Sequence, residues 1–528
     1  MPSPGRAVKT DHPTTRTHHP WPAVEVNRTS VLFPTIDFAI FFVAVFTASW
    51  LLRPWPRAWK VMILVASYIF YGWWDWHFTF LLAASTLINQ AGAILVSRLR
   101  DPRSRRWAMA ATIAGDIGLL GWFKYYGFFA VNVANGLHRF GLHSPLPLLQ
   151  VVLPVGISFF TFMGISYVVD VQRGTTNVAG WLDAAVYLSF FPHLVAGPIV
   201  RASELIPQLR AQRDPRRIDA SRAAWLIMAG LAKKIVISSF VASHVVDPVF
   251  AAPHQHSGLE VLFAIYGYAV QIYADFSGYT DIAIGVALLL GVRFPENFNA
   301  PYTAESLQDF WRRWHITLST WLRDYVYIPL GGNRHGKWRT ACNIMITMLI
   351  GGLWHGAAWT FVAWGALMGG GQVIGMLRRD RAARRSEPSA PALVVVAPHP
   401  GMPAVSMAAP VTDQSTRSAG RVWLARLVTF HLVCLGWVLF RATSLANAVA
   451  MLSRLVHPGP APLVTPLVVG VIVGSIASQY VPSDVVARAQ RRFADLAPLA
   501  QGAVLACGLY VITALAPSGV APFIYYRF

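Results

Sequence analysis

Long runs without a charged residue dominate this sequence. Asp, Glu, Lys and Arg are absent from residues 61–74, 78–97, 184–200, 261–274, 341–377, 462–483 and 496–523. A membrane-spanning helix needs about 20 apolar residues, and several of these runs reach that length. The chain is 55% hydrophobic and only 13% charged, so we expect an all-α polytopic integral membrane protein. Segments with one internal charge raise the expected number to about eleven spans, with re-entrant and interfacial helices between them.

The net charge of +20 raises the question of nucleic acid binding. The basic residues lie in short loops between apolar runs rather than on a soluble domain, which argues against nucleic acid as a partner. Basic loops favour the cytoplasmic side of a membrane. We therefore predict that 98–107 and 378–385 face the cytoplasm and anionic lipid headgroups, and that the N-terminus lies outside.

We divide the chain into four parts. Residues 1–29 are polar and lack the apolar stretch of a cleaved signal peptide. Residues 30–385 form a membrane core, 386–420 a flexible loop rich in Pro and Ala, and 421–528 further spanning helices of the same domain.

Polar residues interrupt the apolar runs at a few places. Asp275 and Asp281 stand in "QIYADFSGYTDIAIG", where a carboxylate is costly. They either fix helix packing or take part in an active site. Asn297 and Asn299 lie between two prolines in "FPENFNAPY", where an amide can serve a turn or bind a ligand.

The segment "WRRWHITLSTWLRDYVYIPLGG" concentrates aromatic, basic and histidine side chains. As one helix over 306–326, it would place Trp311 and His315 on the same face. The arginines would project elsewhere; they are Arg312, Arg313 and Arg323.

A second histidine, His355, lies near the middle of the charge-free run 341–377. That run is either one tilted helix or two pieces broken at Gly351–Gly352. An imidazole at membrane depth needs hydrogen-bond partners and is expected to be neutral, which is the form that a general base requires.

Several kinds of catalytic site are missing from the sequence. It has no G-x-S-x-G elbow, no phosphate-binding glycine loop and no H-E-x-x-H metal motif. The three cysteines lie in apolar segments without a C-x-x-C pair. That excludes a thiolate metal site, and each cysteine is expected to be a small core residue.

The motifs "PENFNAPY", "FWRRWHITLSTWLRDYVYIPLGGNRHG" and "GGLWHGAAWTF" follow one another in this order. In these motifs the chain resembles the membrane-bound O-acyltransferase (MBOAT) superfamily, and within it the alginate O-acetyltransferase branch. "LPVGISFFTF", "FFPHLVAGPIVR", "YADFSGYTDIAIG" and "PFIYYRF" are similar to that branch as well. The resemblance runs from about residue 31 to the C-terminus, with 386–420 as an unmatched insertion.

The resemblance implies a ring of helices around a tunnel in a bacterial inner membrane. It also implies acetyl transfer from a cytoplasmic donor, acetyl-CoA or another acetyl thioester, toward an extracytoplasmic polysaccharide such as alginate. Partner acetyltransferases outside the membrane would complete the transfer, and no cofactor would remain bound.

The matching motifs also suggest site residues. His355 takes the place of the main catalytic histidine, and His315 that of a second one. The positions expected to bind substrate or donor are Asp275, Asn297, Asn299, Arg312, Arg313, Arg323 and Trp354.

Other functions remain open at this point. D-alanyl transfer to teichoic acid, or O-acetylation of peptidoglycan or cellulose, would use nearly the same chemistry. A transporter without chemistry or a scaffold of a polymer-secretion complex would belong to a different class.

Overall fold

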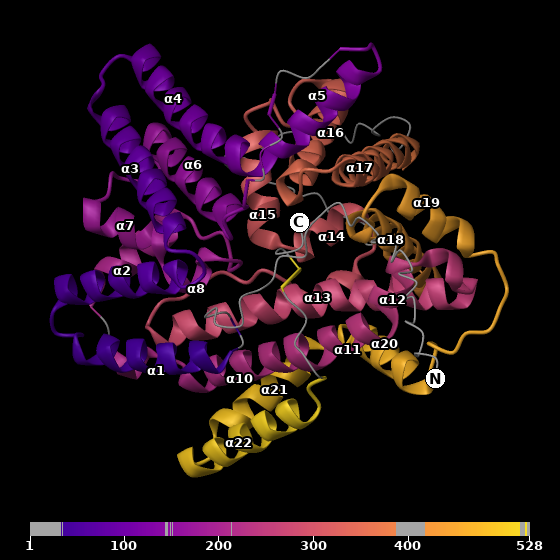
Figure 1. The fold of residues 1–528 in the computed structure, drawn as a ribbon. Helices are drawn as coiled ribbons and strands as arrows, with labels where there is room; N and C mark the ends of the chain where they lie inside the picture. Colours follow the sequence, from indigo (N-terminus) through magenta and orange to yellow (C-terminus); the bar gives the residue numbers. More distant parts are fainter. Residues whose placement is uncertain are drawn as a thin grey trace, which may run out of the picture.

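The computed structural model describes residues 33, 35–142, 146–147, 149, 151–212, 214–386, 418–517 and 523–524. In this part of the chain the secondary structure is helical, apart from one isolated bridge between Phe298 and Trp314, so the all-α fold class is confirmed (Figure 1). The predicted segment 1–29 and nearly all of the predicted loop 386–420 lie outside the described residues. The helices are α1 (Ile36–Leu51), α2 (Pro56–Gly72), α3 (His77–Arg98), α4 (Pro102–Leu120), α5 (Tyr126–His138), α6 (Ile157–Arg173), α7 (Trp181–Ser189), α8 (Phe191–Leu194), α9 (Ala202–Arg210), α10 (Ala220–Leu231), α11 (Ser239–Val241), α12 (Asp247–Ala251), α13 (Gly258–Leu289), α14 (Leu307–Arg313), α15 (Ile316–Leu322), α16 (Gly336–His355), α17 (Trp359–Ser386), α18 (Ala419–Arg441), α19 (Leu445–Arg454), α20 (Pro466–Ser478), α21 (Ser483–Ala494) and α22 (Pro498–Ala514).

The long helix α13 crosses the centre of the molecule (Figure 1). It begins with a capping box, in which the Ser257 hydroxyl accepts from the Glu260 amide and the Glu260 carboxylate accepts from the Ser257 amide. Small residues let α10 approach it closely, because a Cβ added to Gly278 would lie 2.8 Å from the Gly230 carbonyl oxygen. The helix is therefore a buried axis on which the other elements pack.

Five helical segments are long and apolar enough to span a membrane. They cover His77–Arg98, Ala220–Ala251, Gly258–Leu289, Trp359–Arg381 and Ala419–Arg441. A sixth span results if α20 and α21, which meet at 94°, are counted together. The expected number of about eleven spans is thus not confirmed in the described residues, since several apolar helices are shorter than a straight span.

The charge-free run 184–200 differs from a spanning helix. Its residues form the end of α7, the single turn of α8 and a non-helical segment to Val200. Gly197 packs so closely that an added Cβ would lie 2.4 Å from the Cα of His193. Irregular backbone of this kind is tolerated at membrane depth because protein, rather than lipid, surrounds it.

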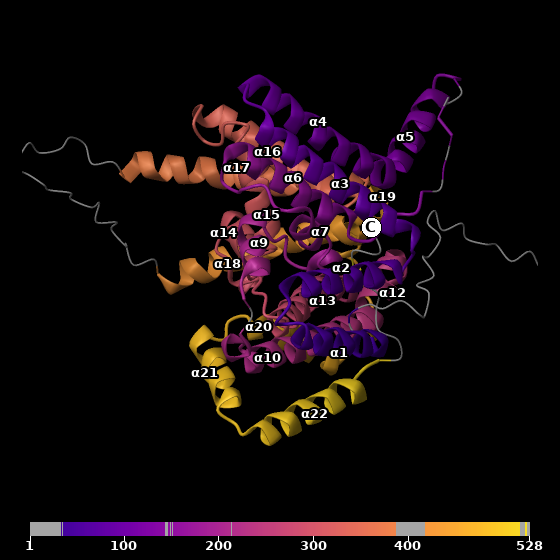
Figure 2. The ribbon, with the colours of Figure 1, turned by 90° about the vertical axis from the view of Figure 1, so that its left-hand side faces the viewer.

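The helices α21 and α22 lie at the edge of the molecule in both ribbon views (Figures 1 and 2). Most side chains of α22 are exposed or half-buried, and Cys507 is among the exposed ones. The expectation of a core position is therefore wrong for Cys507, whereas Cys434 on α18 is buried.

The basic loops meet on one side of the molecule. Arg105 on α4 donates to the carbonyl of Gln172 at the end of α6 (3.1 Å), and Arg173 donates to the carbonyl of Asp324 (3.2 Å). Arg201, which precedes α9, pairs with the Asp324 carboxylate (3.2 Å). We call this side the basic face.

The end of α17 joins the basic face. Lys337 in the first turn of α16 pairs with Asp380 (2.7 Å), and a short turn connects α16 to Asp324. Figure 2 shows the C-terminal end of α17 and the start of α18 extending beyond the other helices on one side. The loop 98–107 and the end of α17 thus share a side, as the charge pattern predicts for two cytoplasmic segments.

Candidate active site

His355 is the last residue of α16, at the tip of the hairpin that α16 and α17 form. The helix ends there because Gly356 adopts an extended conformation. The two helices touch near the tip, since a Cβ added to Gly352 would lie 2.3 Å from the carbonyl oxygen of Phe361. The charge-free run 341–377 is therefore two helices. Its break is at Gly356 and not at the two preceding glycines, which serve close helix packing instead.

His315 lies between two short helices and not on a continuous one. The predicted helix over 306–326 is wrong, because α14 ends at Arg313 and α15 begins at Ile316. His315 has a φ of 42°, a left-handed conformation that costs free energy in a non-glycine residue. It is held by pairing with a distant loop, since the Ile316 amide donates to the Asn297 carbonyl (3.0 Å).

The indole of Trp354 lies between the two imidazoles. Its ring centroid is 5.8 Å from that of His315 and 5.0 Å from that of His355. His315 is 0% exposed and His355 is 3% exposed. Two histidines that are far apart in sequence thus meet around one aromatic ring, with further aromatic contacts from Phe276 to His315 and from Phe440 to His355.

Asn297 determines which ring nitrogen of His315 carries the proton. The amide N–H of Thr317 donates to the side chain of Asn297 (3.2 Å), so the accepting atom must be the oxygen Oδ1. The same oxygen lies 3.1 Å from Nδ1 of His315, so Nδ1 carries a proton and Nε2 of the neutral ring carries the lone pair. That Nε2 atom, and Nδ2 of Asn297, are buried without a hydrogen-bond partner among the described residues.

A third polar atom without a partner lies beside His355. Nε1 of Trp364 is buried and donates to no group among the described residues, and the ring centroid of Trp364 is 5.1 Å from that of His355. By contrast, the Nε1 atom of Trp354 lies 3.4 Å from the carbonyl oxygen of Ser158 and donates to it. Sequence reasoning selected Trp354 for its N–H and missed Trp364, whose N–H is the available one.

The described contacts of the other predicted site residues are with groups other than the two imidazoles. Asn299 is exposed, and its backbone amide donates to the carbonyl of Arg313 (2.9 Å). The Arg313 side chain pairs with Asp309 (3.0 Å), and Arg312 is exposed. Arg323 donates to the carboxylate of Asp324 on the basic face (2.7 Å).

The buried carboxylates of α13 are engaged by protein groups. Asp275 pairs with Lys234, accepts from the Ser238 hydroxyl at 3.3 Å, and accepts from the backbone amide of Ile524 at 2.8 Å. Asp281 pairs with Lys233. These contacts join α13 to the neighbouring π-helix η3 (Ala232–Ser238) and to the C-terminal residues, and they favour the packing role over a direct part in the site.

Sequence reasoning missed two residues that hold the hairpin tip. They lie in the π-helix η1 (Gly121–Tyr125) between α4 and α5. Lys124 donates to the carbonyl of Trp354 and, at 3.3 Å, to that of His355. The Tyr125 hydroxyl donates to the carbonyl of Leu353 (2.8 Å). The signal was present as one lysine in the otherwise apolar stretch "GLLGWFKYYGFFAV".

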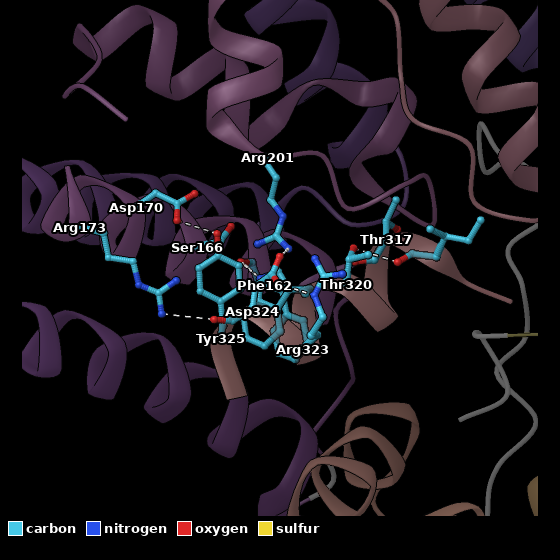
Figure 3. Close-up of polar contacts among 12 residues, drawn as sticks. Phe162, Ser166, Asp170, Arg173, Arg201, Thr317, Thr320, Arg323, Asp324 and Tyr325 are labelled. Atoms are coloured by element: carbon cyan, nitrogen blue, oxygen red, sulfur yellow. Dashed lines mark hydrogen bonds and ion pairs between the residues drawn. The ribbon is translucent and has the colours of Figure 1, made fainter. Parts of the chain in front are cut away.

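A cluster of arginines surrounds Tyr325 on the basic face (Figure 3). The guanidinium carbon of Arg201 lies 4.3 Å from the centroid of the Tyr325 ring, and that of Arg173 lies 5.3 Å from it. The Tyr325 hydroxyl donates to Asp170 (2.7 Å). Nη1 of Arg201 is buried without a partner among the described residues. We call Arg173, Arg201 and Arg323 the arginine cluster.

An aromatic chain connects the arginine cluster to the two histidines. The ring centroid of Tyr325 lies 5.1 Å from that of Trp321, which stacks on Phe162 at 3.7 Å. Phe162 in turn lies 5.6 Å from Trp354. The basic face and the histidine pair are therefore linked by contiguous packed rings.

Comparisons with known proteins agree with this arrangement. Residues 176–381, which include both histidines, match the membrane-bound O-acyltransferase family. The "Probable alginate O-acetylase AlgI" of Azotobacter vinelandii is 38% identical over 418 residues, which cover 79% of this chain and 76% of the relative. The protein of the same name from Pseudomonas aeruginosa is 37% identical over 421 residues, 79% of this chain and 73% of the relative.

A relative with a different printed acceptor is also similar. The "Peptidoglycan O-acetyltransferase" of Helicobacter pylori is 34% identical over 428 residues, which cover 76% of this chain and 74% of the relative. Similarity of this extent, together with a family match that covers both histidines, makes the enzyme class clear. The chain belongs to the membrane-bound O-acyltransferase family and is a multi-pass membrane O-acyltransferase of the alginate O-acetylase type.

Proposed function

We propose that this enzyme moves acetyl groups from a cytoplasmic acetyl thioester, such as acetyl-CoA, across the inner membrane for O-acetylation of a polysaccharide. Alginate is the first candidate, because two similar relatives carry that name. The observation that carries the proposal is the gathering, at the histidine pair, of polar atoms that have no partner within the described part of the chain. They are Nε2 of His315, Nδ2 of Asn297 and Nε1 of Trp364. A buried polar group without a partner costs about 1–3 kcal/mol, so a bound substrate is the natural partner.

The chemistry needs a base and hydrogen-bond donors. In our proposal His355 takes the proton of the acceptor hydroxyl, and the acceptor oxygen attacks the thioester carbonyl carbon. The N–H groups of Asn297 and Trp364 donate to the carbonyl oxygen as it gains negative charge. The C–S bond then breaks, and the thiolate leaves with the proton that His355 had taken. His315, whose Nε2 carries a lone pair, can accept a hydrogen bond from the acceptor hydroxyl and orient it.

The arginine cluster is our candidate site for the phosphates of the donor. Guanidinium groups suit phosphate oxygens, and Nη1 of Arg201 donates to no group in the parts of the chain that the structure describes. Tyr325, Trp321 and Phe162 lead from this cluster to Trp354. A thioester arm that follows these rings from a phosphate on the basic face would reach the histidine pair. Arg323 keeps its predicted donor-side role in this proposal, with Arg173 and Arg201 as its neighbours.

The test uses a bacterial strain that lacks the gene and carries either the wild-type enzyme or the His355→Gln variant. We expect the wild type, and not the variant, to restore bound acetate in alginate, with both proteins present in the membrane at equal amounts. Restoration in peptidoglycan alone would favour the acceptor of the Helicobacter pylori relative. Normal acetylation by the variant would refute a catalytic role of His355 and favour a transporter or a scaffold.

The final acceptor also involves partners in this proposal. Extracytoplasmic acetyltransferases would receive the acetyl group and pass it to the polymer. Strains that lack those proteins but retain this enzyme should lose polymer acetate, while the purified enzyme should still consume the thioester in the presence of a small hydroxyl acceptor.

A further inference from the structure

We propose that Lys124 is a positioning residue that holds the tip of the α16–α17 hairpin and, through it, the imidazole of His355. The proposal rests on the acyl-transfer function given above and adds a residue to it. The described hydrogen bonds of the Lys124 ammonium are with two backbone carbonyls and the Ser158 hydroxyl. It acts through the backbone on which the imidazole stands.

The contacts of the Lys124 ammonium converge on the tip. It donates to the carbonyl of Trp354, to the carbonyl of His355 at 3.3 Å, and to the hydroxyl of Ser158 on α6 at 3.1 Å. An ammonium has three N–H donors, so all three are used. Ser158 also accepts, through its own carbonyl, the N–H of the Trp354 indole (3.4 Å). Lys124 thus ties α6 and the end of α16 together around the ring that separates the two histidines.

The hydrogen bonds from Lys124 and Tyr125 satisfy backbone carbonyls at the end of α16. The last carbonyls of an α-helix have no partner within the helix, and a cation is favourable there because the helix dipole places partial negative charge at that end. Lys124 and Tyr125 donate hydrogen bonds to the carbonyls of three consecutive residues, Leu353, Trp354 and His355. They belong to a π-helical turn, a rare element that often marks functional sites.

Lys124 differs from the other described lysines in the partners of its charge. Each of the other four lysines in the described residues pairs with an aspartate, at Lys60, Lys233, Lys234 and Lys337. The described contacts of Lys124 are instead with three neutral oxygens and with the ring of Trp354, whose centroid lies 5.8 Å from Nζ. A partly buried cation whose described partners include no carboxylate is costly to keep, which favours a function for it. A lysine needed only for packing could be replaced by an apolar residue at no such cost.

The kinetic test compares Lys124→Met, Lys124→Arg and the wild type in lipid nanodiscs, with an acetyl thioester as donor. Methionine keeps the length of the side chain and removes all three donors, whereas arginine keeps both charge and donors. Displacement of a catalytic group by about 1 Å can cost about 100-fold in rate. We expect kcat to fall about 100-fold in Lys124→Met, with the donor KM within about threefold of wild type, and about tenfold of that loss to return in Lys124→Arg. Lys337→Met is the matched control and should keep the wild-type kcat, since Lys337 pairs with Asp380 on the basic face.

A second measurement does not depend on turnover. Hydrogen exchange of the backbone amides around residues 353–358, followed by mass spectrometry, should become about tenfold faster in Lys124→Met and stay unchanged in Lys337→Met. Unchanged exchange at the tip would overturn the proposal, as would a wild-type kcat in Lys124→Met despite faster exchange. A folded Lys124→Arg protein with no recovery of kcat would also overturn it. A wild-type enzyme that consumes no thioester would count against the proposed function, while the exchange measurement would still decide the role of Lys124.

Discussion

The side-chain oxygen of Asn297 lies 3.1 Å from Nδ1 of His315, and this contact leaves the lone pair of the imidazole on Nε2. Asn297 also holds an N–H group without a partner among the described residues. One amide therefore serves two purposes in the proposed function, because its oxygen sets the histidine tautomer and its nitrogen is left to donate to a substrate.

Replacement of Asn297 by Ala should remove both functions. We expect kcat to fall by about 100-fold or more, the size of effect seen when one donor to a developing oxyanion is lost. The measurement is initial-rate kinetics with an acetyl thioester. Asn447→Ala, on the peripheral helix α19, is the control; its side chain donates to the Phe250 carbonyl (3.2 Å) far from the histidine sequence motifs. Equal activities of the two variants would contradict the assigned role of Asn297.

The hairpin that carries His355 should be sensitive to single methyl groups. A Cβ at Gly352 would lie 2.3 Å from the carbonyl oxygen of Phe361, whereas nothing lies within 4 Å of a Cβ at Gly370 on α17. Gly352→Ala should force the helices apart at a cost of about 1–3 kcal/mol, with a lower melting temperature and lower activity. Gly370→Ala should behave as wild type in thermal unfolding and in turnover. If both alanine variants have the melting temperature of the wild type, the close contact of α16 and α17 at the tip is contradicted.

The arginine cluster should govern donor binding rather than the chemical step. Loss of a charge-assisted hydrogen bond costs about 1.5–3 kcal/mol, so Arg201→Gln should raise the donor KM by about tenfold or more and leave kcat within a factor of about three. The control is Arg488→Gln, at an exposed arginine that pairs with Asp484 on α21 (2.6 Å). An unchanged donor KM in Arg201→Gln would contradict the proposal that the arginine cluster binds the phosphates of the donor.

The two ion pairs of α13 should differ in their effect on stability. The side chains of Lys234 and Asp275 are 2% and 3% exposed, whereas those of Lys233 and Asp281 are 22% and 21% exposed. Asp275→Asn leaves a buried ammonium without its carboxylate, and removal of one partner of a buried pair costs about 3–5 kcal/mol. Asp281→Asn should cost less, because water reaches its partner. Thermal unfolding in detergent should therefore show the larger decrease for Asp275→Asn, and a double replacement, Lys234→Met with Asp275→Leu, should recover much of it. The reverse order would contradict this assignment.

The sequence predicted the fold class and the position of His355 because both depend on the absence of charge over long stretches. Apolar runs are a local property, and His355 stands in the longest of them. The break beside His315 could not be predicted in this way. It arises from hydrogen bonds between residues 297–299 and 313–316, which no periodicity within 306–326 reveals.

Roles that depend on partners across the fold were the hardest to predict. Arg313 stood next to the histidine motif in sequence, yet it pairs with Asp309. Lys124 was more than 200 positions away and donates to the residues around the site. Neighbourhood in sequence therefore does not show which cation contacts the backbone at His355, because the element that supplies the contact is a π-helical turn far away in the chain.

The contact between Asp275 and Ile524 has a consequence for biosynthesis. The amide of Ile524 reaches back 249 positions to a carboxylate in the centre of α13, and Phe523 packs near Phe276, which in turn touches His315 (centroid distances 6.0 and 4.7 Å). The core around the histidine pair is therefore complete only after Phe523 and Ile524 have been synthesised and have packed against α13. Chains released just before residue 523 by a nonsense codon would thus retain the described helices and still lack the contacts of Phe523 and Ile524 with α13.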